Sequence, residues 1–89
     1  MASFPGGSAW AMARDIGEGY HAVTERTFLR MSRADLDKLT FELNRLLQEV
    51  RGNQAPQDDV QALQQRNRKL QRLNSALTVL RAYRMKRKI

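Results

Sequence analysis

The chain of 89 residues contains no cysteine, which excludes disulfide bonds and thiolate metal sites. It has one histidine, His21, and its nine carboxylates are scattered along the sequence. Acid–base and nucleophilic catalysis need several such groups gathered in one pocket, and no grouping of that kind can be recognised. We therefore expect a protein that is not an enzyme and that holds neither a cofactor nor a metal ion.

Long apolar runs are also missing. No segment approaches the roughly 20 consecutive apolar residues that span a membrane, and residues 2–13 lack the basic start of a secretory signal. We expect a soluble, cytoplasmic protein without a transmembrane segment. Because a chain of 89 residues buries only a modest share of its surface, forming a homodimer or joining a larger complex would add stability.

Acidic residues are absent from the last third of the chain. Residues 60–89 contain nine Lys or Arg and no Asp or Glu, whereas residues 1–59 contain seven basic and nine acidic side chains. The net charge of +7 is therefore about −2 followed by +9. Charge separated this sharply along a sequence predicts an anionic partner.

Residues 33–51 form the clearest predicted helix. Ser32 and Asp35 have the spacing of a capping box at its start, and Gly52 is a natural stop at its end. Between them, apolar side chains recur at helical spacing and fall on one stripe. These are Leu36, Leu39, Leu43, Leu46, Leu47 and Val50.

Residues 57–88 form the second predicted helix. Pro56 precedes it, Asp58 and Asp59 suit its first turn, and the basic residues near its end suit the negative end of the helix dipole. Its leucines form a short heptad seam of the coiled-coil type. They are Leu63, Leu70 and Leu77 in one row, with Leu73 and Leu80 in the other.

The short connection predicts that these two helices are antiparallel neighbours. Counting outward from it places Leu47 near Leu63 and Leu36 near Leu73. The second helix is the longer, so residues 77–89 are expected to overhang the first.

Residues 9–30 are the third predicted helix, with Ser8 as its cap, although Gly17 and Gly19 inside it each cost roughly 1 kcal/mol. This helix would cover the overhang. The predicted fold is therefore all-α: residues 32–89 form an antiparallel helical hairpin with a long basic C-terminal helix. The partly helical segment 1–31 completes it to a three-helix bundle, or a second chain completes it to a dimer.

The basic residues of the second helix are the candidate binding site for nucleic acid or another polyanion. They are Arg66, Arg68, Lys69, Arg72, Arg81, Arg84, Lys86, Arg87 and Lys88. The order of seam and basic cluster is the reverse of that in basic-zipper proteins, and no helix-turn-helix or zinc spacing is present. We predict a non-catalytic helical binding module that contacts the backbone of RNA or DNA in a nucleoprotein assembly. A solvated helix face, an acidic protein surface and an anionic membrane surface are the other interpretations.

A protein–protein adaptor or structural subunit is the alternative function, and it would assemble through the leucine seam. The predicted helix–helix or oligomer interface consists of Leu36, Leu39, Leu43, Leu46, Leu47, Leu63, Leu70, Leu73, Leu77 and Leu80. Phe41 lies opposite the leucine stripe of its helix and predicts a second packing surface, for the N-terminal segment, a second protomer or another protein. Trp10 and Tyr20 join Phe41 as candidates for a partner surface.

Overall fold

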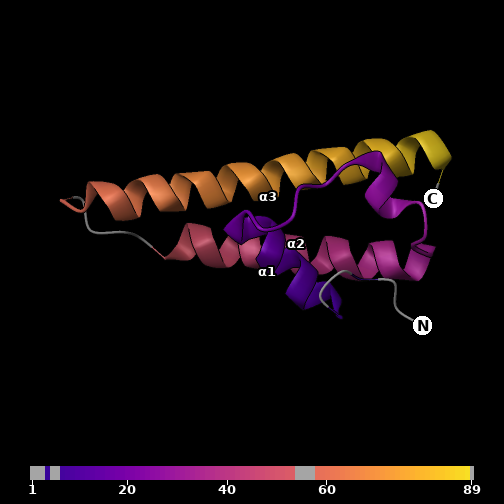
Figure 1. Ribbon diagram of the computed structural model, residues 1–89, viewed down its shortest axis with the longest axis horizontal. Coiled ribbons are helices and arrows are strands. Elements are labelled where there is room, and N and C mark those ends of the chain that lie inside the picture. The colour runs from indigo at the N-terminus through magenta and orange to yellow at the C-terminus, as the bar shows by residue number, and fades with distance from the viewer. Residues whose placement is uncertain (1–3, 5–6, 54–57, 89) are drawn as a thin grey trace.

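The computed structural model describes Phe4 and residues 7–53 and 58–88. Its elements are α1 (Ala9–Glu18), the short 3-10 helix η1 (Glu25–Phe28), α2 (Arg33–Gly52) and α3 (Val60–Arg87), and the described residues contain no strand. Figure 1 shows α2 and α3 running antiparallel along the long axis, and α1 contacts both of them. The fold is all-α, with three helices packed into one bundle, as the sequence predicts in outline.

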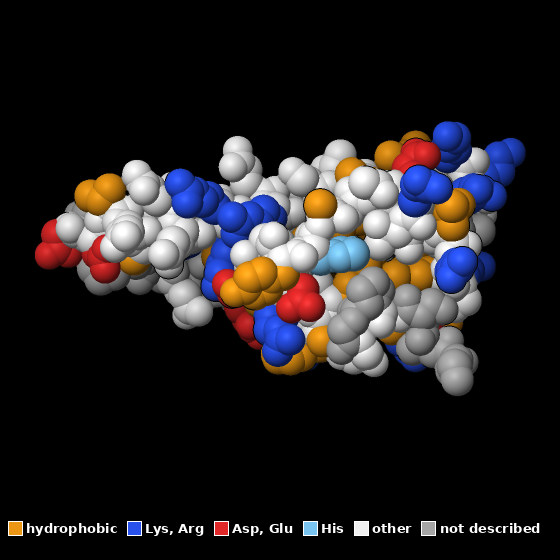
Figure 2. All heavy atoms as spheres, viewed as in Figure 1, with side chains coloured by type: hydrophobic (Ala, Val, Ile, Leu, Met, Phe, Trp, Pro, Cys, Tyr) orange, Lys and Arg blue, Asp and Glu red, His pale blue; other side chains and the backbone are white. Residues whose placement is uncertain are grey.

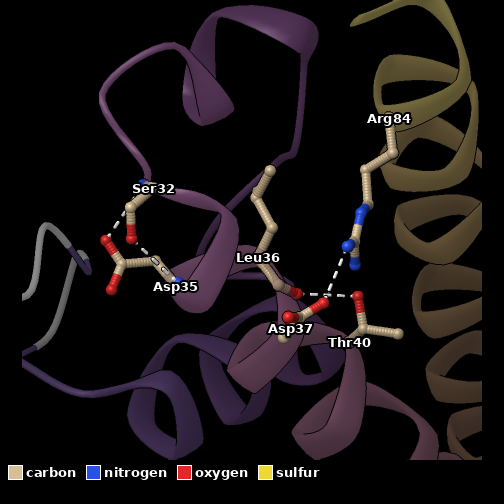
Figure 3. A network of polar contacts seen from close by, with 6 residues as sticks. All are labelled: Ser32, Asp35, Leu36, Asp37, Thr40 and Arg84. Carbon is tan, nitrogen blue, oxygen red and sulfur yellow. Dashed lines mark hydrogen bonds and ion pairs between the residues drawn. The ribbon is translucent and has the colours of Figure 1, made fainter. Parts of the chain in front are cut away.

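The capping box predicted at the start of α2 is confirmed (Figure 3). Ser32 Oγ accepts a hydrogen bond from the Asp35 amide at 3.1 Å, and Asp35 Oδ2 accepts one from the Ser32 amide at 3.2 Å. These two bonds satisfy donors that the first helical turn leaves free. The helix ends at Gly52, one residue beyond the predicted boundary.

The long helix α3 begins at Val60 behind a cap supplied by Asp59, whose Oδ1 accepts a hydrogen bond from the Ala62 amide at 3.0 Å. Its predicted start at Gln57, and Pro56 before it, lie outside the described residues. Its 28 residues span about 42 Å. Among the described residues, no helix is long and apolar enough to cross a membrane.

The prediction of one helix over residues 9–30 is wrong beyond Glu18. Ser8 caps α1 as expected, its Oγ accepting from the Ala11 amide at 3.1 Å, but the helix ends where Gly19 adopts a φ of 89°. That left-handed conformation suits glycine and stops a helix. The chain then runs without helix until η1, where the ring of Phe28 packs against that of Tyr83 with centroids 5.4 Å apart. Figure 1 shows this segment running beside α3 as far as η1.

The predicted register of the hairpin is also wrong. Asp37 in the second turn of α2 pairs with Arg84 near the end of α3, so the start of α2 faces the last turns of α3 rather than Leu73. Arg66 reaches the last turn of α2, so residues 60–65, about 9 Å of helix, lie beyond it. The overhang is thus at the connection end (Figure 1), because α3 begins well past the end of α2.

Most leucines of the predicted seam lie in the hydrophobic core. Fully or nearly fully buried leucines from both long helices pack with side chains of the N-terminal segment in one cluster. The buried members of the predicted interface are Leu36, Leu39, Leu43, Leu47, Leu73, Leu77 and Leu80, while Leu46 and Leu70 are partly buried against them. Leu63 is half-buried. The other half of this core therefore comes from the same chain, with Met12, Ile16 and Phe28 among its members.

Candidate polyanion-binding surface

The nine predicted cations form two groups along α3, which we call the middle group (Arg66, Arg68, Lys69, Arg72) and the end group (Arg81, Arg84, Lys86, Arg87, Lys88). The face drawn in Figure 2 shows blue side chains gathered in two places, halfway along the molecule and at the end where α3 finishes. The two groups differ in how many of their cations bind carbonyl or carboxylate groups of the protein itself.

Arg66 of the middle group closes the C-terminal end of α2. Its Nε donates to the carbonyl oxygens of Val50 and Asn53, both at 3.2 Å, and its Nη2 donates to that of Arg51 at 3.1 Å. The last carbonyls of a helix have no partner within the helix and carry its negative dipole end. Arg66 therefore holds the overhanging start of α3 against α2.

Two further members of the middle group bind the C-terminal end of α1, whose last turn contains no basic residue of its own. Arg72 Nη1 donates to the carbonyl oxygen of Gly17 at 3.1 Å, and Lys69 Nζ lies 2.8 Å from Glu18 Oε1. Arg68 is exposed and makes no ion pair or hydrogen bond with any described residue. Three of the four middle cations thus stabilise the bundle itself.

The end group is bound less completely. Arg84 Nη2 lies 2.7 Å from Asp37 Oδ1 (Figure 3), and Lys86 Nζ lies 3.6 Å from Glu25 Oε2. The guanidinium of Arg87 lies 5.6 Å from the ring centroid of Tyr83 and has no carboxylate partner among the described residues. Arg81 and Lys88 are exposed and have no such partner there either.

A pocket of about 320 Å³ adds a cation that the sequence did not place in this group. Arg26 of η1 lines it together with Lys86 and Arg87, over a floor that includes Leu29 and Tyr83, and Glu25 is its only acidic residue. We name the exposed cations of η1 and of the last two turns and C-cap of α3, which are Arg26, Arg81, Lys86, Arg87 and Lys88, the end surface. Nothing in the local sequence marks Arg26, because only the packing of η1 on α3 brings it there.

The predicted partner side chains lie on other faces. Phe41 is 63% exposed and Trp10 49% exposed, and the two line a shallow groove of about 360 Å³ between α1 and α2. Trp10 of the N-terminal segment therefore lies in the same groove as Phe41, but this segment leaves the Phe41 ring exposed. Tyr20 is 82% exposed and does not line that groove.

Among the described residues, no three His, Asp or Glu side chains gather closely enough to hold a metal ion. No protein-family model, curated protein or solved structure matches this chain.

Proposed function

We propose that the protein is a non-catalytic helical binding module whose end surface engages the phosphate backbone of RNA or DNA. The observation that carries this proposal is the convergence of Arg26 from η1 with Lys86 and Arg87 from α3 around one pocket, with Arg81 in the same last two turns of α3 and Lys88 at its C-cap. Glu25 is the only acidic residue lining that pocket. Lys86 lies 3.6 Å from the carboxylate of Glu25, whereas Arg26, Arg81, Arg87 and Lys88 have no carboxylate partner among the described residues. Cations without such partners release counterions from a polyanion when they bind it.

Arg84 is a poorer choice for a test than its neighbours, because it already pairs with Asp37. The informative variant replaces Arg81, Arg87 and Lys88 by Ala. Binding of the wild-type protein to structured RNA, duplex DNA and heparin is measured between roughly 50 and 200 mM salt. About five phosphate contacts cost on the order of a thousandfold in affinity over that range.

The triple variant is expected to lower the slope of log affinity against log salt by about 3 while keeping its helical circular dichroism. The matched control replaces Arg14, Arg45 and Arg51 by Ala, which removes the same net charge from exposed positions outside α3. The control should keep most of the slope. An equal loss in both variants would reduce the proposal to non-specific attraction by net charge.

A second candidate function, a self-assembling structural subunit, is favoured by the Trp10–Phe41 groove. The buried Oε2 of Glu42, which also lines the groove, has no hydrogen-bond donor, and Lys38 on the same groove has no ion-pair partner among the described residues. Two copies related by a twofold axis would offer each other opposite charges and two exposed rings. Assembly through this groove replaces assembly through the leucine seam, because the seam is largely buried.

Sedimentation equilibrium tests this second candidate. Phe41→Ser should abolish concentration-dependent association without loss of helix, whereas Tyr20→Ser, at a still more exposed aromatic residue outside the groove, should not. A monomeric wild-type protein at all concentrations rules the candidate out.

A further inference from the structure

A pocket of about 420 Å³ lies between α3 and the segment that follows α1. Its apolar walls come from Ile16 of α1, Val23 of the segment and Val79 of α3. Its volume is within the range of small-ligand sites, which combine apolar walls with a few convergent polar groups. The end surface does not include any of its lining residues.

The polar groups of this pocket converge from two elements. Gln71 and Ser75 lie one turn apart on α3, and each can both donate and accept a hydrogen bond. His21 lies across from them on the segment, and its Nε2 is buried without a hydrogen-bond partner among the described residues. A buried polar atom without a partner is rare in folded proteins and calls for an explanation.

One cation of the middle group lines this pocket, and another lies one helical turn before it. Arg72 lines the pocket, and its Nη1 donates to the Gly17 carbonyl oxygen at 3.1 Å. Arg68 precedes it by one helical turn and has no partner among the described residues. The pocket therefore combines a flat imidazole, apolar walls, an amide and a hydroxyl with positive charge beside it.

We propose that this pocket receives one unpaired base of the nucleic acid whose backbone the end surface binds. A base has two apolar faces and an edge of donors and acceptors, and His is among the side chains on which unpaired bases stack. Arg72 and Arg68 would face the phosphates on either side of that base. The inference rests on the proposed function, and it makes single-stranded or looped RNA or DNA the favoured form of the ligand.

Fluorescence anisotropy with a labelled single strand and a duplex of the same sequence and length tests the inference. We expect the wild-type protein to bind the single strand about tenfold more tightly, the scale of one base stacked on an aromatic side chain. Ser75→Leu fills the pocket and should remove this preference while leaving the duplex affinity and its salt slope unchanged. Thr78→Leu adds the same side chain to an exposed position of α3 outside the pocket and should change neither affinity.

His21 supplies a direct readout because it is the only histidine, so its imidazole gives an isolated proton signal. The single strand should shift that signal in the wild-type protein and not in Ser75→Leu. Equal affinity for single strand and duplex, with no effect of Ser75→Leu, overturns the base pocket while backbone binding stands. Absence of salt-dependent binding to every polyanion overturns both proposals.

Discussion

The two halves of α3 use similar residues for opposite purposes. In the first half, residues 60–72, no side chain is buried, and three of the four cations are bound to the ends of α1 and α2. In the second half, residues 73–88, five side chains are buried, and three of the five cations have no carboxylate partner among the described residues. The density of basic residues along a helix is therefore a poor guide to which charges are available to a ligand.

The difference follows from what each half lies against. The first half extends beyond α2, so it meets helix ends, whose free carbonyls attract guanidinium groups. The second half lies beside the start of α2 and η1, so its apolar stripe is covered and its polar side faces solvent.

Truncating one leucine in each half of α3 should give the largest difference in the free energy of unfolding. Leu80 is fully buried and Leu63 half-buried, both on α3. Leu80→Ala should lower the free energy of unfolding by about 2–5 kcal/mol through the lost burial and the cavity that remains. Leu63→Ala should cost about 1 kcal/mol or less, measured by urea denaturation. Similar costs for both would mean that the overhang is packed as well as the bundle.

The two glycines at the end of α1 should respond with opposite signs. Gly19→Ala forces a side chain into a left-handed conformation, and its Cβ would lie 2.9 Å from Arg72 Cζ, so a loss of about 2 kcal/mol is expected. Gly17→Ala places its Cβ at ordinary contact, 3.5 Å from Leu46 and Leu73 side-chain carbons, and should stabilise by about 0.5 kcal/mol. Thermal unfolding of both variants measures this, and a stabilising Gly19→Ala would contradict the helix end at Gly19.

The smallest contrast compares one cation from each half. Arg72→Ala should lower the free energy of unfolding by about 1 kcal/mol, because the Gly17 carbonyl loses a charged donor. Arg81→Ala should change it by less than about 0.5 kcal/mol, since Arg81 is exposed and has no partner among the described residues. The measurement is chemical denaturation at low salt. Because a Cβ at position 19 would lie 2.9 Å from Arg72 Cζ, the double variant Gly19→Ala with Arg72→Ala should cost less than the two single costs together.

Local signals predicted the elements well and their arrangement less well. The capping box of Ser32 and Asp35 and the cap at Ser8 act within one turn, so the sequence alone located both helix starts. Gly19 ends α1, although Tyr20 and Val23 beyond it continue the apolar spacing of a helix. The packing of Phe28 against Tyr83 further along the chain cannot be recognised in any local pattern.

The candidate binding surface could also be predicted only in part from the sequence. The segregation of charge into residues 60–89 is visible in the sequence and predicts an anionic partner. The sequence does not show that Arg66 and Arg72 bind carbonyl oxygens at helix ends. It also does not show that Arg26 lies at the end surface. The pocket beside His21 also escapes sequence reasoning, because a lone histidine carries no spacing signal.

The sequence by itself determined the helical class, the starts of α1 and α2, the apolar stripes and the charge of the C-terminal helix. These properties arise from interactions within one or two turns. Only the tertiary structure decided the register of α2 against α3, the cations left for a ligand and the walls of the pocket. Those depend on contacts such as Arg84 with Asp37 and Arg72 with Gly17, which join residues 47 and 55 positions apart. Such contacts form only when whole helices pack, because side-chain packing sets helix register and a short connection leaves it open.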